Sequence, residues 1–154
     1  MRSWRRWFVH EREEEVNKKY EIIEHIADIG IRAFGGDLKE LFVNSAQGMF
    51  AIIADLNKVE VKKSLKIECK AESLEELLVS WLGELLYHFN VDEILGKEFT
   101  IVKLDNNYLE GEIGGDKFDS TKHFLKNEIK GVTYHNLKIE EKDDLWQVEV
   151  IFDV

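Results

Sequence analysis

The chain has 154 residues, a length typical of one domain, and 44% of them are hydrophobic, which excludes a disordered chain. Its formal net charge of -10 repels a phosphate backbone, so the sequence predicts no direct nucleic-acid binding. No apolar run reaches the roughly 18–20 residues of a membrane span, and the single Cys69 excludes an internal disulfide. We therefore expect a soluble, cytoplasmic protein that contacts no membrane.

Residues 1–19 differ in composition from the rest of the chain. They mix arginine with large aromatic residues and then become strongly polar, without the 7–15-residue apolar segment of a signal peptide. A basic-aromatic arm that touches RNA or a membrane is one interpretation; a short appended or frayed extension is the other, and we favour the extension. No Pro, linker or repeat marks a boundary after about Tyr20, so we expect residues 20–154 to form a single domain.

The first half of this domain reads as two strands and a helix. Residues 20–23 and 29–34 are short apolar segments, typical of strands, on either side of a polar connection. Asp37 follows a pair of glycines and forms a capping box with Glu40, and apolar residues at helical spacing then predict a helix over residues 37–54.

A strand and a second helix follow. Apolar and charged residues alternate over 59–71, which predicts a half-buried strand. Ser73 and Glu76 form a second capping box, and a wide apolar stripe predicts a core helix over residues 73–90. The apolar faces of the two helices place these side chains in the core: Leu41, Met49, Leu78, Trp81 and Leu85.

The rest of the chain reads as strands. Residues 99–104 and 108–113 flank the turn Asp105-Asn106-Asn107, and residues 131–140 and 145–154 form a final pair. Several strands joined by short turns, with two helices to cover them, predict an α+β fold. We expect a mainly antiparallel β-sheet with the two main helices packed on one face.

Familiar catalytic motifs are missing from the sequence. There is no phosphate-binding loop, no Gly-x-Ser-x-Gly elbow and no pair of histidines at zinc spacing, and Cys69 lies on the apolar side of a strand. Two polar features remain. Asp28 closes the connection between the first two strands, where a turn-capping role competes with a functional one. At the other end, Asp153 stands beside the α-carboxylate of Val154, so that two hard oxygen donors of the kind that calcium and magnesium bind are adjacent. A solvated C-terminal strand is the alternative, and the chain end taken alone favours it.

Four segments together resemble the archease family over almost the whole of residues 20–154. They are residues 20–30 (YEIIEHIADIG), 73–82 (SLEELLVSWL), 128–140 (EIKGVTYHNLKIE) and 150–154 (VIFDV). The resemblance implies an archease-like fold and an accessory protein that activates RtcB-type RNA ligases in tRNA splicing. In that family the accessory protein promotes GTP-dependent guanylylation of the ligase and its multiple turnover, and is not itself an enzyme.

The resemblance also implies a divalent cation, usually calcium, with magnesium and manganese as the alternatives. The family's metal ligands fall on Asp28, Asp153 and Val154, the last through main-chain oxygen. Its functional lysine falls on Lys130. Three positions depart from the family pattern: Ile26 replaces a common Thr, and Gly131 and Asn136 replace residues expected to be Ala and Gly.

Two other functions stay open at this point. One is a chaperone-like protein-interaction module that acts on other partners. The other is an enzyme that uses Asp28 and Asp153 as acid and base with His25 or His135 nearby, which we rank last because no sequence feature indicates a substrate pocket.

Overall fold

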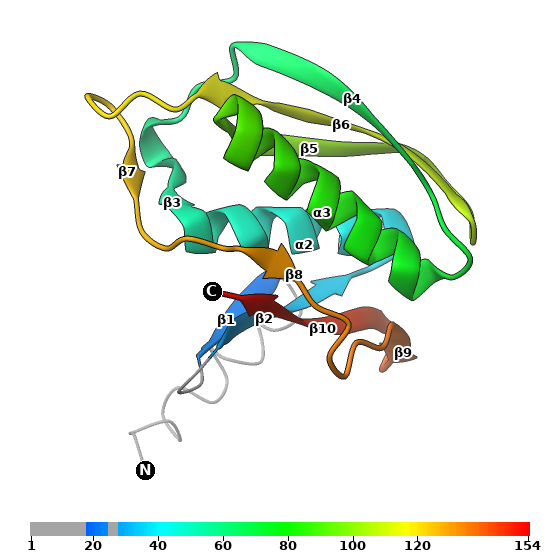
Figure 1. Cartoon of the computed structure of the whole chain (residues 1–154). Helices are drawn as coiled ribbons and strands as arrows, with labels where there is room; N and C mark the ends of the chain where they lie inside the picture. The colour runs from blue at the N-terminus through cyan, green and yellow to red at the C-terminus, as the bar shows by residue number, and fades with distance from the viewer. Residues whose placement is uncertain (1–17, 25–27) are drawn as a thin grey trace.

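Two helices lie between two antiparallel sheets in this computed structural model, which describes residues 18–24 and 28–154 (Figure 1). The first sheet runs in the order β1 (Tyr20–Glu24), β2 (Ile29–Gly35), β10 (Leu145–Asp153) and β8 (Gly131–Val132), and β9 (Glu140–Lys142) pairs with the start of β10. The second sheet contains β4 (Lys63–Lys70), β6 (Tyr108–Lys117) and β5 (Ile94–Leu104). A two-stranded ribbon joins β3 (Ala54–Asp55) to β7 (Phe124–Leu125).

Every strand pair of the described residues is antiparallel, which confirms the predicted α+β class. The prediction of a single sheet was wrong. The strands divide between two sheets, and the helices contact both of them. Because the apolar stripes of both helices are wide, each helix can bury apolar side chains against a sheet on either side.

Both helices begin where their caps predict. The carboxylate of Asp37 accepts the backbone N–H of Glu40 at 2.8 Å, and α2 runs over Leu38–Ile53. The hydroxyl of Ser73 accepts the N–H of Glu76 at 3.1 Å, and α3 runs over Leu74–Asp92. A short 3₁₀ turn, η1 (Leu56–Lys58), follows β3. No helix in the described part of the chain has the length and apolarity needed to cross a membrane.

The predicted core residues are all fully buried between the sheets. The indole N–H of Trp81 donates to the backbone oxygen of Phe42 at 3.1 Å, which ties α3 to α2 without leaving a buried donor unsatisfied. Gly111 lets β6 approach this indole closely, because a Cβ at position 111 would lie 2.8 Å from the Trp81 ring. The structure thus confirms five predicted core positions: Leu41, Met49, Leu78, Trp81 and Leu85.

Two predicted strands are shorter than the sequence suggested. The strand expected over residues 59–71 begins only at Lys63, after the chain has passed through η1. The strand expected over residues 131–140 splits into β8 and β9, because Asn136 adopts a left-handed conformation (φ 53°) in a turn that interrupts the pairing. Leu137 and Ile139, beyond this turn, pack against the core, so the apolar pattern there reports burial and not a strand.

Candidate functional site

Strands β2 and β10 bring Asp28 and Asp153 to the same end of the first sheet. Ile29 of β2 pairs with Phe152 of β10 in antiparallel register. Asp28 directly precedes Ile29, and Asp153 directly follows Phe152, so a continuation of this register sets the two aspartates opposite each other. Opposed residues of an antiparallel pair point to the same face of the sheet. Two residues that are 125 positions apart in the sequence therefore lie at the same end of the sheet, where β2 begins and β10 ends.

The Asp28 side chain has an unusual environment. The residue is half-buried, and its Oδ1 atom is buried without a hydrogen-bond partner among residues 18–24 and 28–154. A buried carboxylate oxygen without a partner is costly, so such atoms in native structures have a reason to be there. A cation would satisfy this oxygen.

The other side of the site is formed by the segment around β8, which holds the end of β10. The backbone N–H of Lys130 donates to the Asp153 oxygen at 2.7 Å. Thr133 donates to the Ile151 oxygen twice, through its backbone N–H at 3.1 Å and its hydroxyl at 2.9 Å. These three bonds, which we call the β8 clasp, fix the last residues of the chain where ends commonly fray.

A glycine permits the close approach of β2 to β10 at this edge. A Cβ on Gly30 would lie 2.5 Å from the Val150 oxygen and 2.9 Å from Cδ1 of Ile151. Backbone cannot give way as a flexible side chain does, so a larger residue would push the strands apart two residues from Asp28. The sequence placed Gly30 in a family motif but gave no sign of this packing role.

The remaining predicted site residues are distributed as follows. Val154 is 43% exposed, and Lys130 and His135 are exposed. The backbone N–H of His135 donates to the Thr133 hydroxyl at 3.2 Å, so the residue follows the clasp directly. His25 and Ile26 lie outside the described residues. Thr133 itself was missed, and no sequence signal marked it, since its role depends on a strand pairing across the sheet.

The described residues hold no group of three or more His, Cys, Asp and Glu side chains arranged as a metal site. The predicted ligand set contains only two such side chains, Asp28 and Asp153, because its third member is the chain end. The donor chemistry of the set, two carboxylates and a terminal carboxylate, is that of a hard cation.

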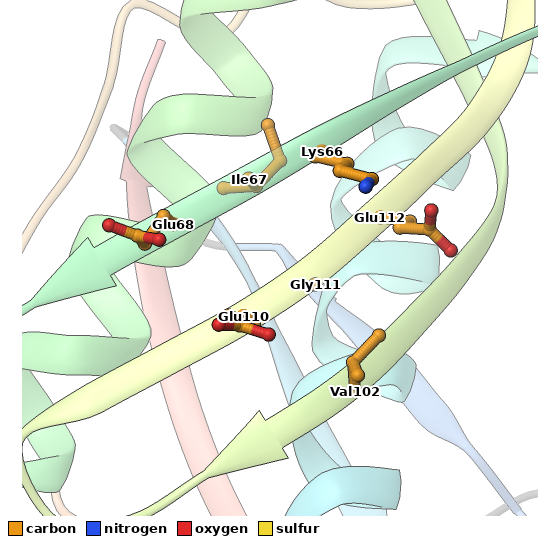
Figure 2. A pocket seen from close by; sticks show the side chains of 7 residues that line it. All are labelled: Lys66, Ile67, Glu68, Val102, Glu110, Gly111 and Glu112. Atoms are coloured by element: carbon orange, nitrogen blue, oxygen red, sulfur yellow. The ribbon is translucent and has the colours of Figure 1, made fainter.

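A second polar region lies on the face of the β4-β6-β5 sheet that points away from the helices. Here a hollow of about 460 Å³ is lined by Lys66, Glu68, Glu110 and Glu112 among others (Figure 2). The Tyr108 hydroxyl lies 2.6 Å from Glu110 and 2.9 Å from Glu68, and the hydrogen bond to Glu110 in particular raises the pKa of the phenol. The Glu68 and Glu110 carboxylates therefore have a hydrogen-bond donor within reach, unlike the buried oxygen of Asp28.

Comparison with known proteins decides the family. Residues 20–154 match the sequence profile of the archease protein family. The chain belongs to the archease family. It is 40% identical over 143 residues to the protein archease of Methanosarcina acetivorans, covering 89% of this chain and 97% of that protein. It is likewise 40% identical over 141 residues to the protein archease of Pyrococcus furiosus, covering 89% of this chain and 99% of that one.

Two solved structures share the archease fold seen here. The solution structure of a Methanobacterium thermoautotrophicum protein is 34% identical, with a TM-score of 0.78, and covers 89% of this chain and 99% of that one. The crystal structure of a Thermotoga maritima archease, described as a possible chaperone, has a TM-score of 0.58 at 21% identity, over 87% of this chain and 96% of that one. The family resemblance read from the four sequence segments is thus confirmed.

Proposed function

We propose that this archease is a metal-binding accessory protein that activates an RtcB-type RNA ligase in tRNA splicing. In this role it promotes GTP-dependent guanylylation of the ligase and its multiple turnover, and it performs no catalysis of its own. Membership of the archease family supports the proposal, as do the four sequence segments that carry the resemblance.

The observation that carries the metal-binding part is the Oδ1 of Asp28, which is buried without a partner among the described residues, at the end of the sheet where β10 stops. Asp28, Asp153 and the Val154 carboxyl end would hold a divalent cation, with calcium favoured over magnesium or manganese. Calcium accepts 6–8 oxygen ligands in flexible geometry, so water and a partner can complete a shell that the chain supplies only in part. Magnesium demands a near-ideal octahedron, which a solvent-exposed chain end is less suited to provide. A bound cation supplies positive charge that offsets the repulsion among these carboxylates.

The chain's own residues prepare the site for a partner. The β8 clasp holds the carboxyl end in place, and the same segment presents the exposed Lys130 side chain beside it. An ammonium group next to an acidic, metal-loaded edge forms a compact polar surface that a protein partner can recognise. We assign Lys130 to that partner and not to the stability of the fold.

The test is GTP-dependent guanylylation of the host's RNA ligase, measured with and without this chain. We expect the native chain to raise the rate, and Lys130→Ala to lower the stimulation at an unchanged melting temperature. Lys66→Ala, an exposed lysine on the other sheet, is the control and should stimulate fully.

Two results would count against the proposal. If the rate of ligase guanylylation is the same with and without this chain, the chaperone-like module becomes the better hypothesis. Full stimulation by Lys130→Ala would place Lys130 among ordinary solvated lysines.

A further inference from the structure

The segment from Lys122 to Lys130 crosses the surface from β7 to β8 and ends beside the C-terminus (Figure 1). We call it the strap. Two buried side chains anchor it, one near each end. His123 and Ile129 are buried at 6% and 2%, whereas the residues around and between them are exposed: Lys122, Phe124, Leu125, Lys126, Asn127, Glu128 and Lys130. The strap is therefore fixed at two points and open to solvent between them.

The strap is fixed by hydrogen bonds as well as by burial. The backbone N–H of Lys126 donates to the Ile53 oxygen at 2.8 Å, and the Asn127 amide donates to the Ile52 oxygen at 2.9 Å. Nδ1 of His123 accepts the N–H of Asp119 at 3.0 Å. The exposed side chains are therefore presented by a held backbone and not by a loose loop.

The charge of the strap contrasts with that of the molecule. From residue 121 to residue 138 the chain carries four lysines against one glutamate, while the whole chain has a net charge of -10. Lys126 and Lys130 belong to none of the ion pairs within the described residues. Lys122 forms one long ion pair, with Asp116 at 4.0 Å. The net charge of -10 disfavours nucleic-acid binding by the bulk of the surface, and the strap is a local exception.

Large aromatic side chains accompany these cations. Phe124 is 68% exposed between Lys122 and Lys126, and Tyr134, just beyond β8, is 59% exposed. Lysine is depleted at protein–protein interfaces, where arginine is the usual cation. Lysines that track a backbone, together with aromatic rings on which bases stack, are instead the combination that binds single-stranded nucleic acid.

We propose that the strap is a contact surface for single-stranded RNA, with Lys122 and Lys126 facing phosphates and Phe124 stacking on a base. Successive lysines four residues apart in an extended segment lie about 13 Å apart, so they face separate phosphates. The proposal does not depend on the metal site or on the ligase. It goes beyond the proposed function, since it assigns the chain a direct contact with RNA.

The experiment is fluorescence anisotropy of a labelled single-stranded RNA oligonucleotide titrated with the isolated chain, at several salt concentrations and without ligase. Two lysine–phosphate contacts predict a slope of roughly -1.4 in log K against log salt. We expect Lys122→Ala/Lys126→Ala to weaken binding about tenfold or more at low salt and to flatten the slope by about 1.4. Phe124→Ala should weaken binding by roughly tenfold, and an RNA duplex should bind less well than the single strand.

Matched controls come from the rest of the surface. Lys63→Ala/Lys66→Ala removes two exposed lysines from β4, and Tyr87→Ala removes an aromatic ring that is 56% exposed on α3. Both should leave RNA binding within twofold of the unaltered chain. No RNA binding at low salt, equal loss in the controls, or equal competition by polyglutamate would overturn the proposal. Guanylylation of the ligase is a separate readout, so the failure of either idea is visible without the other.

Discussion

Asp28 combines a structural cost with the proposed ligand role. Its Oδ1 is buried without a partner among the described residues, and burying a polar atom unsatisfied costs roughly 1–3 kcal/mol. A residue that weakens the metal-free fold and strengthens the metal-bound one behaves oppositely with and without calcium.

Replacing Asp28 with Ala should therefore leave the metal-free melting temperature unchanged or raised. The increase in melting temperature that calcium produces should be largely lost, since a ligand stabilises only in proportion to its affinity for the folded state. Differential scanning calorimetry in chelator and in calcium makes the comparison, with Glu84→Ala, an exposed carboxylate on α3, as the control. A variant that melts much earlier in chelator, and still gains the full shift from calcium, would make Asp28 an ordinary structural residue.

Thr133 offers a test of the β8 clasp one residue at a time. Thr133→Val keeps the shape and the backbone bond but removes the hydroxyl that donates to Ile151, which should cost about 0.5–1.5 kcal/mol. Calcium affinity should fall as well, because the last residues are then less well held. Thr133→Ser keeps the hydroxyl and should bind calcium normally. If Thr133→Val is destabilised yet binds calcium as tightly as the unaltered chain, the clasp has no part in the site.

At the scale of elements, the two helices were the most predictable part of the fold. Their caps are local in the sequence, and the hydrogen bonds of Asp37 and Ser73 form as the capping boxes predict. The division into two sheets was not predictable, because an alternating strand does not reveal which partner it will find. The adjacency of Asp28 and Asp153 has the same origin: it follows from the β2–β10 register and from no spacing along the chain.

The outer face of the first sheet is held by a cross-strand clamp. Arg32 of β2 donates to Glu21 of β1 at 2.6 Å and to Glu149 of β10 at 3.0 Å. Burial disfavours the ionised form of Glu21, but hydrogen bonds from Lys18 and Arg32 outweigh it, so the pKa of this carboxyl lies below its ordinary value of 4.5. All three clamp side chains are one-third or more exposed, so each pair contributes at most about 1 kcal/mol.

The sign of the pH dependence follows from that lowered pKa. Stabilisation by Glu21 is fully present above pH 4.5 and is lost as the pH falls through the lower folded-state pKa. Arg32→Gln should reduce the melting temperature slightly near neutral pH and reduce its fall as the pH drops below about 4.5. Thermal melts over this range check the effect against Lys66→Gln. If the melting temperature of Arg32→Gln falls at low pH as steeply as that of the unaltered chain, the clamp contributes nothing to acid sensitivity.

On the scale of the whole molecule, an acidic archease body carries two distinct polar surfaces side by side. The sheet edge at Asp28 and Asp153 gathers oxygen donors, and the strap beside it carries exposed lysines. Both depend on the C-terminal strand, because β10 pairs with β2 on one side and with β8 on the other. The position of the chain end is therefore central to the proposed function.

The most direct measurement is a calorimetric titration with calcium of the chain with its native end and of the same chain carrying a short C-terminal tag. The tag moves the α-carboxylate away from Asp153, so the tagged chain should bind calcium more weakly, as should Asp153→Ala. A chain tagged at the N-terminus instead should bind as the native one does. Equal calcium affinity in the native, C-terminally tagged and Asp153→Ala chains would contradict a cation site built from Asp28, Asp153 and Val154.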